Sequence, residues 1–207
     1  MGGRPIQEQF GGRVIEAFSE FARAEVKPID DLVKNEFAHV NDPQLRQSLA
    51  EVLFGARWLY KLGLALLVRD AERAAHVRAQ ILDYASVTEA LLQHAVARRI
   101  AAGLSAGTQF QFADKNQHRK IDWTRGTHAQ IVGRQNFWWL VVVASEVGVI
   151  TPLLSKEVDW LRKRRNTVHL LEHASVGRSS YLQHSERAFR ALVATIRATK
   201  KCLASIK

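Results

Sequence analysis

The chain has 207 residues, 47% of them hydrophobic, which is enough for one domain with a sizeable core, alone or with a helical extension. Its 30 lysines and arginines outnumber its 20 acidic residues, and the net charge of +10 suits a polyanionic partner (RNA, DNA or an acidic protein) as well as it suits an ordinary basic surface. A single cysteine, Cys202, excludes an internal disulfide framework and argues against a cysteine-based zinc site.

No segment has the pattern of a signal peptide or a membrane span. Residues 1–10 lack an apolar core, and the two most apolar stretches, 58–68 and 137–150, fall short of the roughly 20 residues needed to cross a bilayer. The lone cysteine fits a reducing compartment. We therefore expect a soluble, cytoplasmic protein with no membrane partner.

Good helix formers fill the stretches between the four prolines, and strict alternation of apolar and polar residues is scarce, so the sequence predicts an all-α fold. Residues 1–41 are interpreted as an N-terminal helical extension and residues 42–207 as the main helical domain. Residues 103–126 form a polar connection with one candidate short strand at 108–112. Helices are expected over about 13–25, 29–37, 43–67, 70–102, 127–147, 153–171 and 180–205.

Several residues mark where these helices begin or pack. Asp42 can cap the third helix, and Pro43 follows at the first helical position, where proline is favoured. Thr151 is a suitable cap for the helix that begins near residue 153. Gly55 and Gly63 lack side chains, and we expect them to allow close contact between helices.

An arginine interrupts the apolar stripe of the helix predicted over 153–171. Arg165 lies within the stripe, and His169, four residues later, projects from the same side. Asn166, three residues before His169, lies on that side as well, whereas Arg164 points away. A guanidinium, an amide and an imidazole thus converge beside apolar neighbours. The stripe consists of Leu154, Val158, Leu161 and Val168.

A guanidinium that faces inward needs a partner, because burying an unpaired charge is costly. A carboxylate from a neighbouring helix would serve, with Glu89 and Glu146 available. A seam between two protomers would also serve, since the charge would then face a groove. The spacing alone favours a third interpretation, an interior hydrogen-bond network of Arg165, Asn166 and His169.

Residues 161–170 (LRKRRNTVHL) resemble the motif helix of the HEPN superfamily of helical bundles. The family signature is an arginine, often followed by asparagine or another polar residue, then four to six residues and a histidine. Arg164 and His169 have the four-residue spacing, whereas Arg165 and Asn166 match the Arg–Asn pair but leave three residues before His169. We favour Arg165 as the catalytic arginine and keep Arg164 as the alternative. The resemblance covers about residues 45–206.

The resemblance implies a HEPN-like up-and-down helical bundle and a metal-independent endoribonuclease without cofactors. In such a site a histidine moves the proton, an arginine holds the phosphate, and an asparagine orients one or the other. His169, Arg165 and Asn166 would take these roles. Each motif supplies one histidine, so an acid–base pair requires a homodimer. The resemblance also implies a toxin or phage-defence effector, with an antitoxin or a sensor protein as a further partner.

Other basic residues are candidates for binding RNA, although each fits a solvated surface as well. The candidates are Arg162, Lys163 and Arg164 beside the motif and Arg119 and Lys120 in the polar connection. No ligand set for a metal occurs at a recognised spacing, and His173 and His184 are expected at the surface. Two other functions stay open: a non-catalytic helical module that binds protein or nucleic acid, and, from charge alone, a DNA-binding protein.

Overall fold

The computed structural model describes residues 11–103, 121–166 and 181–206, and within these ranges 79% of the residues are helical and none forms a strand. The predicted all-α class is confirmed. The HEPN-like form of the bundle and the domain boundary at residue 42 stay predictions. The elements are α2 (Gly12–Arg23), α3 (Ile29–Asp31), the short π-helix η1 (Leu32–Glu36), α4 (Pro43–Ala65), α5 (Asp70–Ala101), α6 (His128–Gly133), α7 (Phe137–Glu146), α8 (Pro152–Asn166) and α10 (Tyr181–Ala204).

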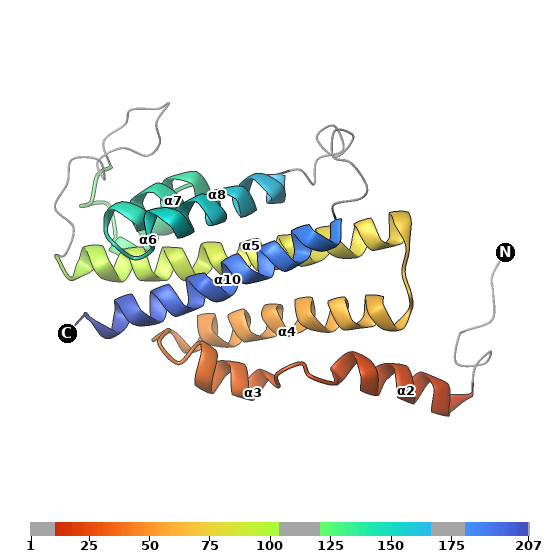
Figure 1. Ribbon diagram of the computed structural model, residues 1–207. Helices are drawn as coiled ribbons and strands as arrows, with labels where there is room; N and C mark the ends of the chain where they lie inside the picture. The colour runs from red at the N-terminus through yellow and green to blue at the C-terminus, as the bar shows by residue number, and fades with distance from the viewer. Residues whose placement is uncertain (1–10, 104–120, 167–180, 207) are drawn as a thin grey trace.

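The long helix α5 runs through the middle of the molecule (Figure 1). It packs against α4 and α10, and against α6, α7 and α8 on a further side. α2 and α3 lie on the far side of α4. The four long helices α4, α5, α8 and α10 alternate in direction along the chain, as an up-and-down bundle requires.

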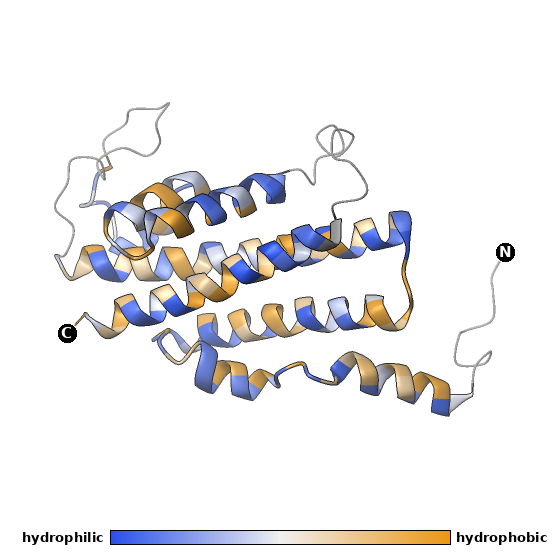
Figure 2. Cartoon of the chain, in the orientation of Figure 1, coloured by the Kyte–Doolittle hydropathy of each residue, from blue (hydrophilic) through white to orange (hydrophobic). Residues whose placement is uncertain are grey.

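One hydrophobic core joins these layers. Apolar residues recur between polar ones along α4 and α5 at helical spacing, so that each helix has a face suited to burial (Figure 2). Removing this apolar surface from water is the main stabilising contribution to such a bundle. The largest fully buried side chains include Phe37, Tyr84, Leu91, Leu92, Leu140, Leu161 and Leu192.

Residues 37–40, which precede α4, hold this segment on the bundle through buried side chains and hydrogen bonds. Phe37 and Val40 are fully buried in the common core. His39 Nε2 lies 3.0 Å from the hydroxyl of Thr199 on α10. Arg46 donates two hydrogen bonds to the carbonyl oxygen of Val40, at 2.8 and 2.6 Å. These contacts fix the end of η1 against the first turn of α4 and the last turns of α10.

Both predicted helix caps are confirmed. The Asp42 carboxylate accepts hydrogen bonds from two backbone amides of the first turn of α4, and Pro43 opens that helix. The Thr151 hydroxyl accepts from the backbone amide of Leu154 at 3.2 Å. The predicted close helix contact at Gly63 is confirmed, because a Cβ there would lie 3.1 Å from the His76 ring of α5. The same prediction for Gly55 is wrong, because a Cβ there would meet nothing within 4 Å.

The single helix predicted over 127–147 is wrong, because the chain forms two helices there. α6 ends at Gly133, and α7 begins at Phe137. Asn136 causes the restart, since its side-chain oxygen accepts a hydrogen bond from the backbone amide of Trp139 at 2.8 Å. The break turns Asn136 toward the face where α8 and α5 meet.

Some predictions lie outside the described residues, among them the candidate strand at 108–112 and the last part of the helix predicted over 153–171. The end of α5 at Ala101 and the limits of α10 agree with prediction to within a residue or two. In the described part of the chain, no helix combines the length and the apolar character that crossing a bilayer demands.

His39 makes the stability of the fold depend on pH. Burial, reinforced by the nearby His94 and Lys200, lowers the pKa of His39 to about 4. The unfolded chain therefore binds the proton first as pH falls below about 6.5, which lowers the free energy of unfolding by about 2 kcal/mol between pH 7.5 and pH 5. In urea titrations, the free energy of unfolding of the wild type should fall by this amount more than that of His39→Gln between these two pH values. Parallel curves for the two proteins would contradict the assignment, and His128→Gln serves as the control.

Candidate functional site

α8 carries the predicted arginine to a junction with α5 and α7. Val158 and Leu161 are fully buried and fix the helix on the core, which confirms the central part of the predicted apolar stripe. Arg165 follows one turn later and donates from Nη1 to Glu89 Oε2 at 2.6 Å. Its guanidinium carbon also lies 5.9 Å from the centre of the Phe137 ring. Glu89 on α5 is therefore the partner, one of the two carboxylates expected.

The other predicted carboxylate, Glu146, forms no ion pair with any described residue. Burial raises the pKa of its carboxyl. It ends α7, whereas Glu89 faces the beginning of the same helix together with Arg165 and Phe137.

The Arg165–Glu89 pair lies in an open cleft with a volume of about 660 Å³. The Arg165 side chain keeps 36% of its surface exposed, and Glu89 keeps 19%. The ion pair therefore borders solvent and is not sealed in the interior. A guanidinium has five N–H donors, and the contact with Glu89 engages the Nη1 end. The cleft is lined by Leu82, Glu89, Asn136, Phe137, Trp138, Arg162, Arg165 and Asn166.

Asp159 organises the basic residues just before Arg165. Its carboxylate pairs with Arg162 at 2.8 Å and with Lys163 at 2.8 Å. Burial raises the pKa of Asp159, but the hydrogen bonds from Lys163 and Arg162 outweigh burial and lower it overall. Arg162 is only 18% exposed and lines the cleft, whereas Lys163 is 67% exposed and lies outside it.

Arg164 lies on another side of α8, as its position in a straight helix predicts. Its guanidinium carbon is 5.8 Å from the centre of the Trp160 ring. His184 and Arg187 of α10 lie against the same indole, at 5.6 and 4.3 Å. Burial, followed by Arg164 and Arg187, lowers the pKa of His184. His184 is thus half-buried, with its ring against Trp160.

The structure therefore brings together part of the predicted site. Arg162, Arg165 and Asn166 share the cleft, and Arg164 does not line it. His169, Arg119 and Lys120 lie outside the described residues, as does His173. Among the described residues, no group of three histidine, cysteine, aspartate or glutamate side chains is placed to hold a metal ion.

Four residues of the cleft were not singled out as site residues from the sequence, namely Leu82, Asn136, Phe137 and Trp138. Asn136 and Trp138 enter the cleft because α7 starts anew at Phe137. The signal was present in the sequence, since asparagine is a favoured cap and here directly precedes an apolar run. With them, the cleft combines one ion pair, two amide side chains and aromatic surface.

Comparison of the chain with family models, with curated proteins and with solved structures found no match.

The contact between Arg165 and Glu89 should couple the two side chains energetically. Both are partly desolvated, so we expect a coupling free energy of about 1 kcal/mol, above the usual value for fully exposed pairs. A double-mutant cycle with Arg165→Gln, Glu89→Gln and the double variant, measured by urea unfolding at low salt, gives this number. A coupling energy indistinguishable from zero would show that the ion pair does not hold α8 on α5.

Proposed function

We propose that the chain is a metal-independent endoribonuclease of the HEPN type, with its site in the Arg165 cleft. The observation that carries the proposal is a half-exposed guanidinium held by Glu89 in an open cleft, next to Asn166 and one turn before His169 in the sequence. The proposal also rests on the resemblance of residues 161–170 to the HEPN motif helix. The basic charge of the chain favours an RNA partner.

The chemistry gives each residue a defined task. His169 would remove the proton from a ribose 2′-hydroxyl, whose oxygen then attacks the adjacent phosphorus and expels the 5′-oxygen of the next nucleotide. The His169 of a second protomer would protonate that leaving oxygen, which leaves a 2′,3′-cyclic phosphate. Arg165 would stabilise the extra negative charge on the phosphoryl oxygens. Glu89 would orient its guanidinium fork, and Asn166 would position the phosphate or the imidazole.

Substitution of the two central residues tests the proposal directly. Arg165→Ala and His169→Ala should each lower the rate of RNA cleavage at least about 100-fold, because each removes a group that acts in the transition state. The assay uses purified protein with transfer RNA and messenger RNA in EDTA and identifies the ends of the products. Arg190→Ala, which removes an exposed arginine of α10, is the matched control. Cleavage that disappears in EDTA would contradict the metal-free mechanism.

The composite site also predicts that one defective protomer inactivates its partner. If each cleavage needs a histidine from both chains, a tenfold excess of His169→Ala protein should lower cleavage per wild-type chain about tenfold after subunit exchange. Activity is measured before and after the two proteins exchange subunits. Light scattering on the wild type should give the mass of a dimer. Unchanged activity in the mixture would argue that a single chain carries the whole site.

A non-catalytic helical module is the second candidate function. The observation that favours it is the Arg165–Glu89 pair itself, because an ion pair between α8 and α5 also serves to hold the bundle together. Under this alternative, His169→Ala would lower the melting temperature, and the wild type would have no RNA cleavage to lose. The two functions thus differ in the activity of the unmodified protein.

A further inference from the structure

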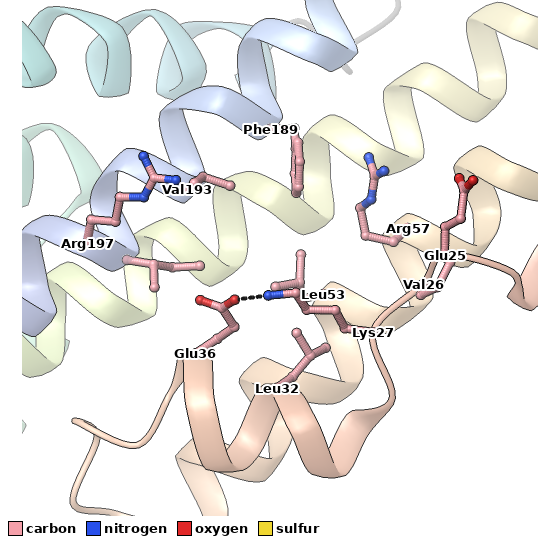
Figure 3. A pocket seen from close by; sticks show the side chains of 11 residues that line it. Glu25, Val26, Lys27, Leu32, Glu36, Leu53, Arg57, Phe189, Val193 and Arg197 are labelled. Atoms are coloured by element: carbon pink, nitrogen blue, oxygen red, sulfur yellow. Dashed lines mark hydrogen bonds and ion pairs between the residues drawn. The ribbon is translucent and has the colours of Figure 1, made fainter.

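A second hollow lies between η1, α4 and α10 and shares no lining residue with the Arg165 cleft (Figure 3). Its volume is about 270 Å³, which suits a small molecule or a short apolar chain. Most of its wall is apolar. The apolar lining residues are Val26, Leu32, Leu53, Phe189, Val193 and Ile196.

Both carboxylates of this hollow are already paired with lysines. Glu36 accepts a hydrogen bond from Lys27 across the hollow (Figure 3). Glu25 accepts one from Lys61 of α4, and this contact lowers the pKa of the Glu25 carboxyl. Neither carboxylate is therefore left to neutralise another positive charge in the lining.

Two arginines of the same hollow have no such partner. No carboxylate of a described residue lies within ion-pair distance of Arg57 or Arg197. Arg57 is half-buried, with its guanidinium carbon 4.3 Å from the centre of the Phe189 ring and 5.1 Å from that of Tyr60. An aromatic face stabilises a guanidinium without using its N–H donors, and the nearby Tyr84 hydroxyl can take only part of the five, so the others are available to an anion. In Figure 3, Arg57 and Arg197 lie on opposite sides of the Lys27–Glu36 pair.

We propose that this hollow binds a small monocarboxylate with an apolar tail, such as a medium-chain fatty acid. The two oxygens of the ligand's carboxylate would accept hydrogen bonds from two N–H groups of the Arg57 guanidinium, as in a bidentate pair. The tail would lie along α10 over Val193 and Ile196. From Phe189, beside Arg57, to Arg197 is eight residues, or about 12 Å of helix, which accommodates a chain of that size. The proposal is independent of the RNA-cleaving site.

The position of the hollow gives binding a structural consequence. One wall belongs to the segment that includes Lys27, Leu32 and Glu36, and the opposite walls belong to α4 and α10. A ligand between them contacts the N-terminal segment and the bundle at once. It would therefore stabilise the docking of that segment on the helices, in proportion to its occupancy.

Calorimetric titration of the full-length protein with octanoate tests the proposal. We expect saturable binding of one octanoate per chain. Octanamide, which keeps the tail and lacks the charge, should bind at least tenfold more weakly, and acetate and inorganic phosphate should not compete. Equal affinity for octanoate and octanamide, competition by acetate or phosphate, or no saturable binding would each overturn the proposal.

Substitutions locate the site on the protein. Arg57→Gln should weaken octanoate binding at least tenfold, and Arg13→Gln, which removes an exposed arginine of α2, should leave it unchanged. Val193→Phe should fill the hollow and abolish binding without altering the charge. Since either variant could perturb folding, octanoate is also titrated into wild-type protein with labelled methyl groups. The methyl signals of Leu53 and Val193 should shift, and those of Val158 should not. Shifts confined to other methyl groups, or full affinity in Arg57→Gln, would overturn the assignment.

Discussion

The packing of α5 on several of its faces is the constraint on which the rest of the structure depends. This 32-residue helix contacts α4, α6, α7, α8 and α10, and 13 of its residues are buried. Two of its buried polar side chains form hydrogen bonds: the Thr88 hydroxyl donates to the Tyr84 carbonyl oxygen at 2.7 Å, and the Gln80 amide oxygen accepts from the Ser185 hydroxyl of α10. Packing on several faces fixes the backbone of this helix. A side chain that extends from it into a solvent-exposed cleft is therefore held in place at its Cα atom. Glu89 is such a side chain.

The ion pair between Glu89 and Arg165 follows from this arrangement. α8 packs on α5 through Val158 and Leu161, and the next turn brings Arg165 to the edge of the contact. There the carboxylate of Glu89 offsets the cost of partly removing the guanidinium from water, while the cleft leaves the charge within reach of a ligand. The same ion pair is thus compatible with two roles for Arg165, binding a phosphate or linking two helices. A measurement of RNA cleavage distinguishes these roles.

Local signals in the sequence were sufficient to predict most of the helices. They did not predict which residues far apart in the chain come into contact. Asp42 and Pro43 identify the start of α4 because capping depends on neighbours in the chain. The position of Arg165 in an apolar stripe indicated that its charge needs a partner, and a carboxylate was one of three interpretations, with Glu89 as one of two candidates. The restart at Asn136 was missed, because an apolar run of helical period continues across it. The hollow at Arg57 depends on residues of η1, α4 and α10 that meet only in the folded chain, so no spacing in the sequence predicts it.

The two arginines differ in what their surroundings offer to an anion. Each lies beside a phenylalanine ring, Arg165 near Phe137 and Arg57 near Phe189. Arg165 already has Glu89, so an anion that binds there must share the guanidinium with a carboxylate. Arg57 meets no competing carboxylate of a described residue, and its surroundings are mostly apolar. A resting monoanion with an apolar body is sufficient to satisfy it, since the guanidinium gains its partner and the walls gain burial in one event.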